Sequence, residues 1–185
     1  MAKSEKIILG IDPGTTVMGY GVIKQVGKNA ELLTFDVVKF KVKDDHYTRL
    51  RHIFESTQKI IEEYLPDEMA LEAPFFGKNV QSMLKLGRAQ GVVMAAGLAR
   101  QIPVTEYPPK RVKQSITGDG NASKEKVAGM LKNIYGFKEI PKLLDATDGL
   151  AVATCHHYTS SSPLGGVKSY SGWESFLKNN PDRQR

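Results

Sequence analysis

Short apolar runs at the start of the chain give way to longer segments with helical periodicity. Residues 6–11 form an apolar run, residues 12–15 are a turn sequence with proline and glycine, and residues 17–26 and 32–42 are again strand-like. Strand-like segments separated by turns at this spacing predict an antiparallel meander of three strands.

The period changes to that of a helix after residue 45. Over residues 46–64, apolar or small side chains recur at helical spacing, namely Leu50, Ile53, Phe54, Thr57, Ile60, Ile61 and Tyr64. Pro66 ends this helix, and residues 69–72 predict a short fourth strand. The rest of the sequence predicts further elements in the order helix 79–100, strand 103–107, and helices 109–116, 123–135 and 142–159.

This order of elements predicts an α/β fold. Three antiparallel strands followed by alternating helices and strands give a mixed five-stranded sheet, antiparallel and then parallel, with helices on its faces. The same order is that of the ribonuclease H-like fold. The chain of 185 residues has the length of one domain, and we assign residues 1–159 to it.

The remaining residues, 160–185, form a tail of different composition that opens with serine, proline and glycine. Trp173, Phe176 and Leu177 stand at the spacing of one turn of an amphipathic helix. The tail either docks such a turn on the domain's own surface, docks it on a partner, or is disordered, and the sequence leaves these alternatives open.

Four acidic residues stand where short apolar segments end or on one face of a helix. Asp12 closes the first apolar run, and Glu72 closes the fourth strand segment. Asp145 and Asp148 are three residues apart, so they share a face of the last helix. In the predicted fold the first strand is central, the fourth lies beside it, and the last helix crosses the same edge. We therefore expect the four carboxylates to converge.

Converging carboxylates predict a metal site. They gather inside a domain only when positive charge joins them, because unpaired buried charge is costly. Four carboxylates suit two Mg²⁺ ions, for which Mn²⁺ is a possible substitute, since these ions take oxygen ligands and bridge to phosphate. Two such ions activate water and stabilise the leaving oxygen of a phosphodiester. Each acidic residue taken singly is equally compatible with a turn, a helix cap or solvated surface.

The charge of the chain favours a polyanionic partner. It carries 26 Lys and Arg against 20 Asp and Glu, a net charge of +6, although solubility alone also explains a basic balance. A single cysteine, Cys155, predicts a small buried residue in a reducing compartment. Because the sequence shows neither a signal peptide nor the ~20 apolar residues of a membrane span, we expect a cytoplasmic protein.

Several motifs resemble the RuvC family of bacterial Holliday-junction resolvases. They cover about residues 6–159 in the family's order and comprise Gly10-Ile11-Asp12-Pro13-Gly14, Gly19-Tyr20-Gly21-Val22-Ile23, Glu72-Ala73-Pro74-Phe75, Lys78-Asn79, Leu84-Lys85-Leu86-Gly87, Arg111-Val112-Lys113-Gln114 and Asp145-Ala146-Thr147-Asp148-Gly149-Leu150-Ala151. The resemblance implies a homodimeric, Mg²⁺-dependent endonuclease that nicks four-way junction DNA symmetrically in recombination and repair. It also implies coupling to a RuvA/RuvB branch-migration complex.

The resemblance implies roles for individual residues as well. It makes the four acidic residues metal-binding and catalytic. Lys113 and Lys124 would hold the scissile phosphate or stabilise the charge that develops on it. One aromatic residue beside the catalytic glutamate would stack on an unpaired base. The further DNA contacts that it implies are Phe75, Lys78, Lys85, Arg88, Lys110 and Arg111. Phe76 departs from the family pattern and is a second candidate for the stacking role.

The helix over residues 79–100 resembles the family's dimer interface. Its small residues allow close backbone approach and are Gly87, Ala89, Gly91, Ala95, Ala96 and Gly97. The same residues serve equally well for tight packing on the sheet of one chain.

Three other interpretations compete with a junction resolvase. A YqgF-like nuclease that matures ribosomal RNA also begins with a strand followed by Asp-x-Gly, but the Phe75 segment, the small-residue helix and the Lys113 region argue against it. An actin-like ATP-binding domain has a similar first loop but needs two lobes, for which 185 residues are too few. A catalytically inactive junction-binding protein is disfavoured because all four carboxylates are present.

Overall fold

The structure is a computed structural model that describes residues 5–74 and 79–161. Several residues singled out in the sequence lie outside this part of the chain: Phe75, Phe76, Lys78, Trp173, Phe176 and Leu177.

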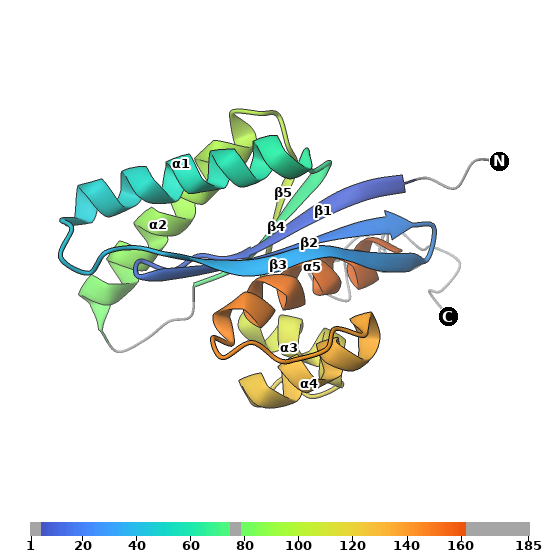
Figure 1. Ribbon diagram of the computed structural model, residues 1–185. Helices are drawn as coiled ribbons and strands as arrows, with labels where there is room; N and C mark the ends of the chain where they lie inside the picture. The colour runs from blue at the N-terminus through green and yellow to red at the C-terminus, as the bar shows by residue number, and fades with distance from the viewer. Residues whose placement is uncertain (1–4, 75–78, 162–185) are drawn as a thin grey trace, which may run out of the picture.

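A mixed five-stranded sheet forms the centre of the fold (Figure 1), with the strand order β3-β2-β1-β4-β5. The central strand β1 (Glu5–Asp12) pairs antiparallel with β2 (Val17–Val26), which pairs antiparallel with β3 (Asn29–Lys39). On its other side β1 pairs in parallel with β4 (Glu68–Glu72), and β4 pairs in parallel with β5 (Val104–Tyr107). The expected sheet is therefore confirmed.

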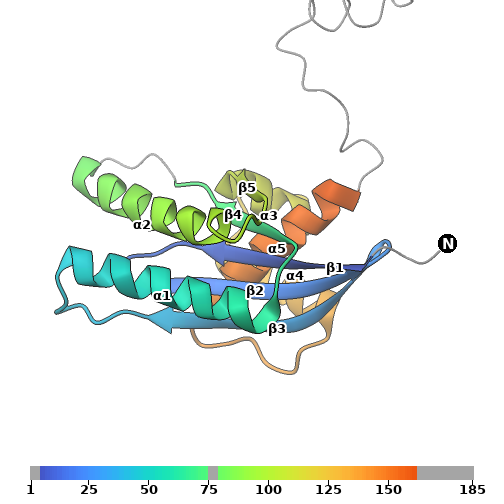
Figure 2. The ribbon, with the colours of Figure 1, turned by 90° about the horizontal axis from the view of Figure 1, so that it is seen from above.

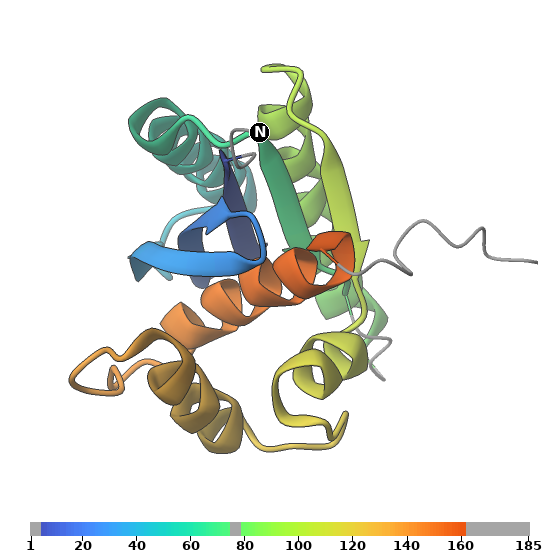
Figure 3. The ribbon, with the colours of Figure 1, turned by 90° about the vertical axis from the view of Figure 1, so that its right-hand side faces the viewer.

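Helices cover both faces of the sheet. α1 (His46–Tyr64) and α2 (Val80–Leu98) lie on one face, and α5 (Asp145–Ser161) lies on the other (Figure 1). α3 (Pro109–Thr117) and α4 (Lys124–Tyr135) pack against α5 on its side away from the strands (Figure 3). Within the described residues, no helix has both the length and the apolar character needed to span a membrane.

Strand alternation decides which side chains meet which helices. In β1, Ile8 packs with the α5 layer, whereas Leu9 packs with α1 and α2. In β4, Ala70 belongs to the α5 layer. Asp12 is four residues after Ile8 in β1, and Glu72 is two residues after Ala70 in β4. Because side chains alternate between the two faces of a strand, both carboxylates lie on the same face as Ile8 and Ala70, toward α5. The sheet thus presents its acidic strand ends to the helix that carries the other two acids.

Glycine lets α5 approach the sheet closely. A Cβ atom added to Gly149 would lie 2.4 Å from Tyr20 Cα, and one added to Gly19 would lie 1.8 Å from the Asp145 carbonyl oxygen. Such distances are far shorter than any van der Waals contact, so no side chain fits at either position. Gly19 is also the register partner of Asp12. The close approach therefore brings the start of α5 to the strand end that carries Asp12.

Two elements begin three residues away from the expected position, and β3 also ends at Lys39 rather than residue 42. β3 begins at Asn29 rather than residue 32, because Gly27 at φ 65° closes a tight hairpin that pairs Val26 with Asn29. α5 begins at Asp145 rather than residue 142, because the carbonyl oxygen of Leu144 accepts the hydrogen bonds of the first helical turn.

Candidate active site

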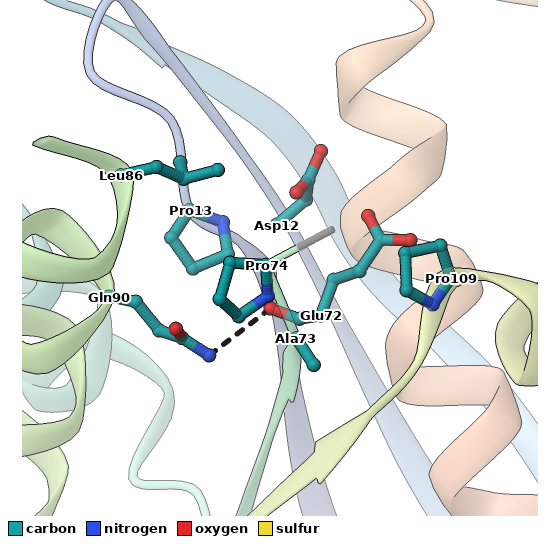
Figure 4. A pocket seen from close by; sticks show the side chains of 8 residues that line it. All are labelled: Asp12, Pro13, Glu72, Ala73, Pro74, Leu86, Gln90 and Pro109. Carbon is teal, nitrogen blue, oxygen red and sulfur yellow. Dashed lines mark hydrogen bonds between the residues drawn. The ribbon is translucent and has the colours of Figure 1, made fainter. Parts of the chain in front are cut away.

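β1 and β4 end side by side and position the first two carboxylates. Ile11 and Leu71 are register partners in the parallel pair, so Asp12 and Glu72 follow as neighbours at the end of the sheet. Figure 4 shows both side chains beside a cleft of about 170 Å³, whose other lining residues are Pro13, Ala73, Pro74, Leu86, Gln90 and Pro109.

The first turn of α5 adds the other two carboxylates. One carboxylate oxygen from each of Asp12, Asp145 and Asp148 lies within 4.8 Å of the others. Divalent cations bind carboxylate oxygens at about 2.0–2.6 Å, so this spacing allows one cation to contact all three. The positive end of the helix dipole also favours negative charge at this turn. The expected convergence of strand ends and helix is present.

Glu72 joins this group from the side of β4. Its carboxyl interacts with that of Asp12 through a hydrogen bond. Glu72 also lines a second pocket of about 40 Å³, together with Val112, Lys113, Lys124, Val127, Asp148 and Ala151. The four predicted acids therefore occupy one continuous site between the sheet end and α5.

The protein environment disfavours negative charge on these carboxyls. Burial raises the pKa of Asp12 well above its usual range, and the neighbouring charges of Glu72 and Asp148 raise it further. Burial is also the main cause that raises the pKa of Glu72 and that of Asp148. A donor set made only of oxygen atoms, held where the carboxylates repel one another, suits a hard divalent cation such as Mg²⁺.

Lys124 approaches the acids from the start of α4. Ser123 caps this helix by accepting a hydrogen bond from the Lys126 amide, which fixes the position of Lys124. The Lys124 ammonium donates to Asp148 and lies 3.8 Å from Asp145. Although burial opposes it, the hydrogen bond to Asp148 raises the pKa of Lys124 above its ordinary value. Lys124 is therefore a fixed positive charge at the rim of the site.

Lys113 reaches the same site from α3. It lines the pocket that contains Glu72 and Asp148, and its positive charge partly offsets the rise in pKa that burial causes at both carboxyls. The structure thus places both predicted lysines beside the predicted acids.

The other predicted DNA contacts lie around the site at different places. Lys110 lines an open groove of about 320 Å³ that Lys113 also borders. Lys85 and Arg88 are exposed on α2. Arg111 on α3 is exposed. Its backbone carbonyl accepts a hydrogen bond from the thiol of Cys155. Cys155 itself is free and buried, as the sequence predicted.

Sequence reasoning missed Gln90, which anchors the backbone at the end of β4. This side chain is 6% exposed. Its amide nitrogen donates to the Glu72 carbonyl at 3.4 Å (Figure 4) and to the Glu106 carboxylate at 2.5 Å. A polar residue between the apolar positions Ala89 and Val93 was the available signal, since both neighbours are buried. Gln90 holds the end of β4 against α2 and β5.

We expect the protein without metal to lose stability as the pH rises above about 4, where carboxyls of the unfolded chain ionise. The folded-state pKa values of Asp12, Glu72 and Asp148 are raised above the unfolded values. The folded state therefore binds more protons between the unfolded and the folded values, and its stability falls as the pH rises through that range.

Thermal unfolding in EDTA, compared between wild type and Asp12→Asn, isolates this effect. At pH 7.5 the variant should melt at least about 2 °C higher than wild type, and the difference should shrink toward pH 5. Adding Mg²⁺ at pH 7.5 should stabilise wild type more than the variant. A wild-type advantage in EDTA at pH 7.5 would contradict the raised pKa values.

The chain is similar to proteins of one family over nearly all of its length. Residues 8–156 match the family described as "Crossover junction endodeoxyribonuclease RuvC". The protein of that name from Christiangramia forsetii is 58% identical over 183 residues, which cover 99% of this chain and 95% of the relative. The one from Porphyromonas gingivalis is 54% identical over 189 residues, covering 100% of both.

Solved structures show the same relationship. The Thermus thermophilus RuvC structure in complex with a Holliday junction substrate is 34% identical and has a TM-score of 0.78. The match covers 84% of this chain and 95% of the chain in that structure. The yeast mitochondrial Holliday junction resolvase Ydc2, 13% identical with a TM-score of 0.59, shares the fold. The ribonuclease H-like architecture is thereby confirmed. With a family match across most of the chain and relatives above half identity, this protein belongs to the RuvC family of crossover junction endodeoxyribonucleases.

Proposed function

We propose that this protein resolves Holliday junctions by paired, symmetric nicks in two strands of a four-way DNA junction. The observation that carries the proposal is the convergence of Asp12, Asp145 and Asp148 within 4.8 Å, with Glu72 adjacent, in a chain of the RuvC family. A phosphodiester brought to this site would meet carboxylates on one side and two lysines on the other. Such an arrangement fits hydrolysis of a phosphate backbone.

The carboxylates would hold the metal that this reaction needs. Asp12, Asp145 and Asp148 offer oxygen ligands to one Mg²⁺ or Mn²⁺, and Asp12 with Glu72 offers a position for a second. When bound, the ions supply an activated water and neutralise charge on the phosphate. Burial of the carboxyls limits competition from bulk water, and Gln90 keeps the Glu72 backbone in place.

The two lysines would act on the phosphate itself. The Lys124 ammonium is oriented by Asp148, which places a donor where charge develops during cleavage. Lys113 faces the same pocket from α3. Replacing Lys113 by alanine should slow nicking by about 10²-fold or more while weakening junction binding far less. Equal losses in rate and affinity would assign it a simple phosphate contact.

The exposed face of α2 supports a homodimer. A Cβ atom added to Gly87 or Gly91 would meet nothing within 4 Å, whereas one added to Gly97 would lie 2.3 Å from Met69. Some small residues of α2 therefore pack on the sheet, and others lie on an open face of the helix. Leu84 and Leu98 are 57% and 60% exposed on that face. Such a face permits close packing of two helices, and each protomer would then meet one of two equivalent strands. Sedimentation as a single-chain species at micromolar concentration would contradict this.

We further propose a cytoplasmic location, where bacterial DNA lies, and cooperation with a RuvA/RuvB branch-migration complex. The bacterial relatives and the buried free thiol of Cys155 support the first, and family membership supports the second. Cell fractionation and faster resolution of a mobile junction in the presence of RuvA and RuvB would test them.

Nicking of matched substrates tests the proposed function directly. The pure protein should cut a labelled four-way junction in two strands of like polarity when Mg²⁺ or Mn²⁺ is added, and should leave duplex DNA and RNA of the same sequence intact. EDTA should stop the reaction. Cleavage of structured RNA without junction cleavage would instead support a YqgF-like nuclease, and tight junction binding without nicking would support an inactive binder.

A further inference from the structure

The N-terminal halves of α1 and α2 run side by side (Figure 2), and both carry basic residues. We call this group the basic cluster; its members are His46, Arg49, Lys85 and Arg88. The charges of the other three members all act on His46, which shows that the four side chains are near one another. None of them lines the cleft or the pocket that contains the carboxylates.

Unpaired polar atoms concentrate at this cluster. Within residues 5–74 and 79–161, the buried side-chain nitrogen and oxygen atoms without a hydrogen-bond partner all lie in the segment 44–49: Asp44 Oδ2, His46 Nδ1, His46 Nε2 and Arg49 Nε. Buried polar groups in folded proteins are almost always paired, and exceptions require an explanation. Three of these four atoms are nitrogens, and an absent anionic ligand accounts for them but not for the carboxylate oxygen of Asp44.

The nearby acids are engaged elsewhere. Asp45 caps α1 by accepting from the amides of Tyr47 and Thr48. Asp44 lies 3.6 Å from the ring nitrogen of His52. Among the ion pairs of the described residues, no carboxylate pairs with a member of the basic cluster. The N-termini of α1 and α2 also lie at this end of the molecule (Figure 2), and their dipoles add positive potential. Basic side chains without an ion pair beside two helix N-termini favour an anion at this place.

The electrostatics of His46 provide a means of detecting the anion. Burial lowers the pKa of His46, and the positive charges of Arg88, Arg49 and Lys85 lower it further, against an opposing effect of Asp45. A negative charge placed among these groups would raise the pKa of His46 instead of lowering it. The imidazole would then take up a proton as the anion binds.

The cluster lies beside the catalytic cleft. Arg49 donates from Nη1 to the Thr15 carbonyl at 3.4 Å, in the loop that directly follows Asp12. On α2, Leu86 lines the catalytic cleft, whereas the adjacent Lys85 is exposed. A nucleic-acid backbone passing through the cleft would thus reach the cluster next.

We propose that the basic cluster binds a second backbone phosphate of junction DNA and that His46 is protonated in the bound state. This inference rests on the proposed function, because it takes the phosphodiester chain as its ligand. The phosphate oxygens would accept from the nitrogens that now lack partners, and the cluster would make DNA binding dependent on pH.

Nuclear magnetic resonance of the His46 ring tests the inference without any need for cleavage. The ring signals are followed from about pH 5 to 8 in wild-type protein, with EDTA present, alone and with a saturating short DNA duplex. We expect the pKa of His46 to rise when the duplex is bound. His52→Gln, on the same helix, is the matched control and should leave this rise unchanged. A His46 titration that the duplex does not alter would overturn the proposal.

Binding measurements provide the second test. Junction affinity of wild type should increase on going from pH 8 to pH 6, by about threefold more than that of His46→Gln. Arg88→Ala, an exposed position that does not endanger the fold, should reduce the log–log salt slope of binding by about 0.9, whereas Lys59→Ala at the other end of α1 should not. Equal pH dependence in wild type and His46→Gln would contradict the cluster.

The two proposals fail in distinguishable ways. A wild-type protein that binds DNA with proton uptake at His46 but never nicks would contradict the proposed function and support the cluster. A protein that nicks junctions but whose His46 titration does not change with DNA would support the proposed function and contradict the cluster.

Discussion

Asp12→Asn is expected to abolish nicking of four-way junctions while leaving junction binding in Ca²⁺ intact. Asp12 contributes to both parts of the acidic site, since its oxygen lies within 4.8 Å of those of Asp145 and Asp148 and its carboxyl interacts with that of Glu72. Asparagine keeps the shape of the side chain but offers a metal only one neutral oxygen. The rate should therefore fall by at least about 10³-fold.

The measurement is a single-turnover nicking assay with saturating enzyme, paired with junction binding by fluorescence anisotropy. Asp36→Asn, which removes an exposed carboxylate from β3, is the matched control and should nick at the wild-type rate. Because the substitution removes a buried charge, the variant should fold at least as stably as wild type without metal. Unimpaired nicking by Asp12→Asn would exclude Asp12 from the active site.

Gly149→Ala is expected to cause a large loss of stability. The new Cβ would lie 2.4 Å from Tyr20 Cα and 2.5 Å from Tyr20 N. Both atoms belong to the backbone of β2, which pairs on both sides and cannot move away without breaking hydrogen bonds. We expect the free energy of unfolding to fall by about 3 kcal/mol, at the upper end of overpacking costs. Nicking should fall as well, because a displaced α5 moves Asp145 and Asp148 away from Asp12.

Gly129→Ala in α4 is the matched control for this prediction, since its new methyl group would meet nothing within 4 Å. Alanine favours a helix over glycine, so this variant should gain up to about 1 kcal/mol. Chemical denaturation of the two variants provides the comparison. A Gly149→Ala protein with wild-type stability would show that α5 does not pack on the sheet as closely as described.

The strand order and the acidic site could be predicted because each rests on a local pattern. The alternation in β1 and β4 fixes the face of Asp12 and Glu72, and the spacing of Asp145 and Asp148 fixes their common face on α5. A parallel pair then brings the strand ends together. None of these steps needs knowledge of side-chain packing.

Other features depend on contacts between distant segments and could not be predicted. The fit between Gly19 and Gly149 joins residues that no periodicity relates. The hydrogen bonds of Gln90 depend on how α2 is seated on β4 and β5. Only Lys85 and Arg88 of the basic cluster could be singled out, because the family resemblance implies DNA contacts at both. His46 and Arg49 look like ordinary residues of an amphipathic helix. The unpaired nitrogens appear only once the two helices are placed together.

The division of the acidic residues between the two ends of the sequence has a consequence for how activity arises during synthesis. A ribosome-bound chain that has reached β4 already carries Asp12 and Glu72, but the helix that supplies Asp145 and Asp148 is made more than seventy residues later. Translation that stops early, or cleavage that removes α5, leaves a fragment with two of the four acidic residues and an uncovered hydrophobic sheet face. Such fragments have no competent centre with which to cut the chromosome, and quality-control proteases can recognise the bare surface.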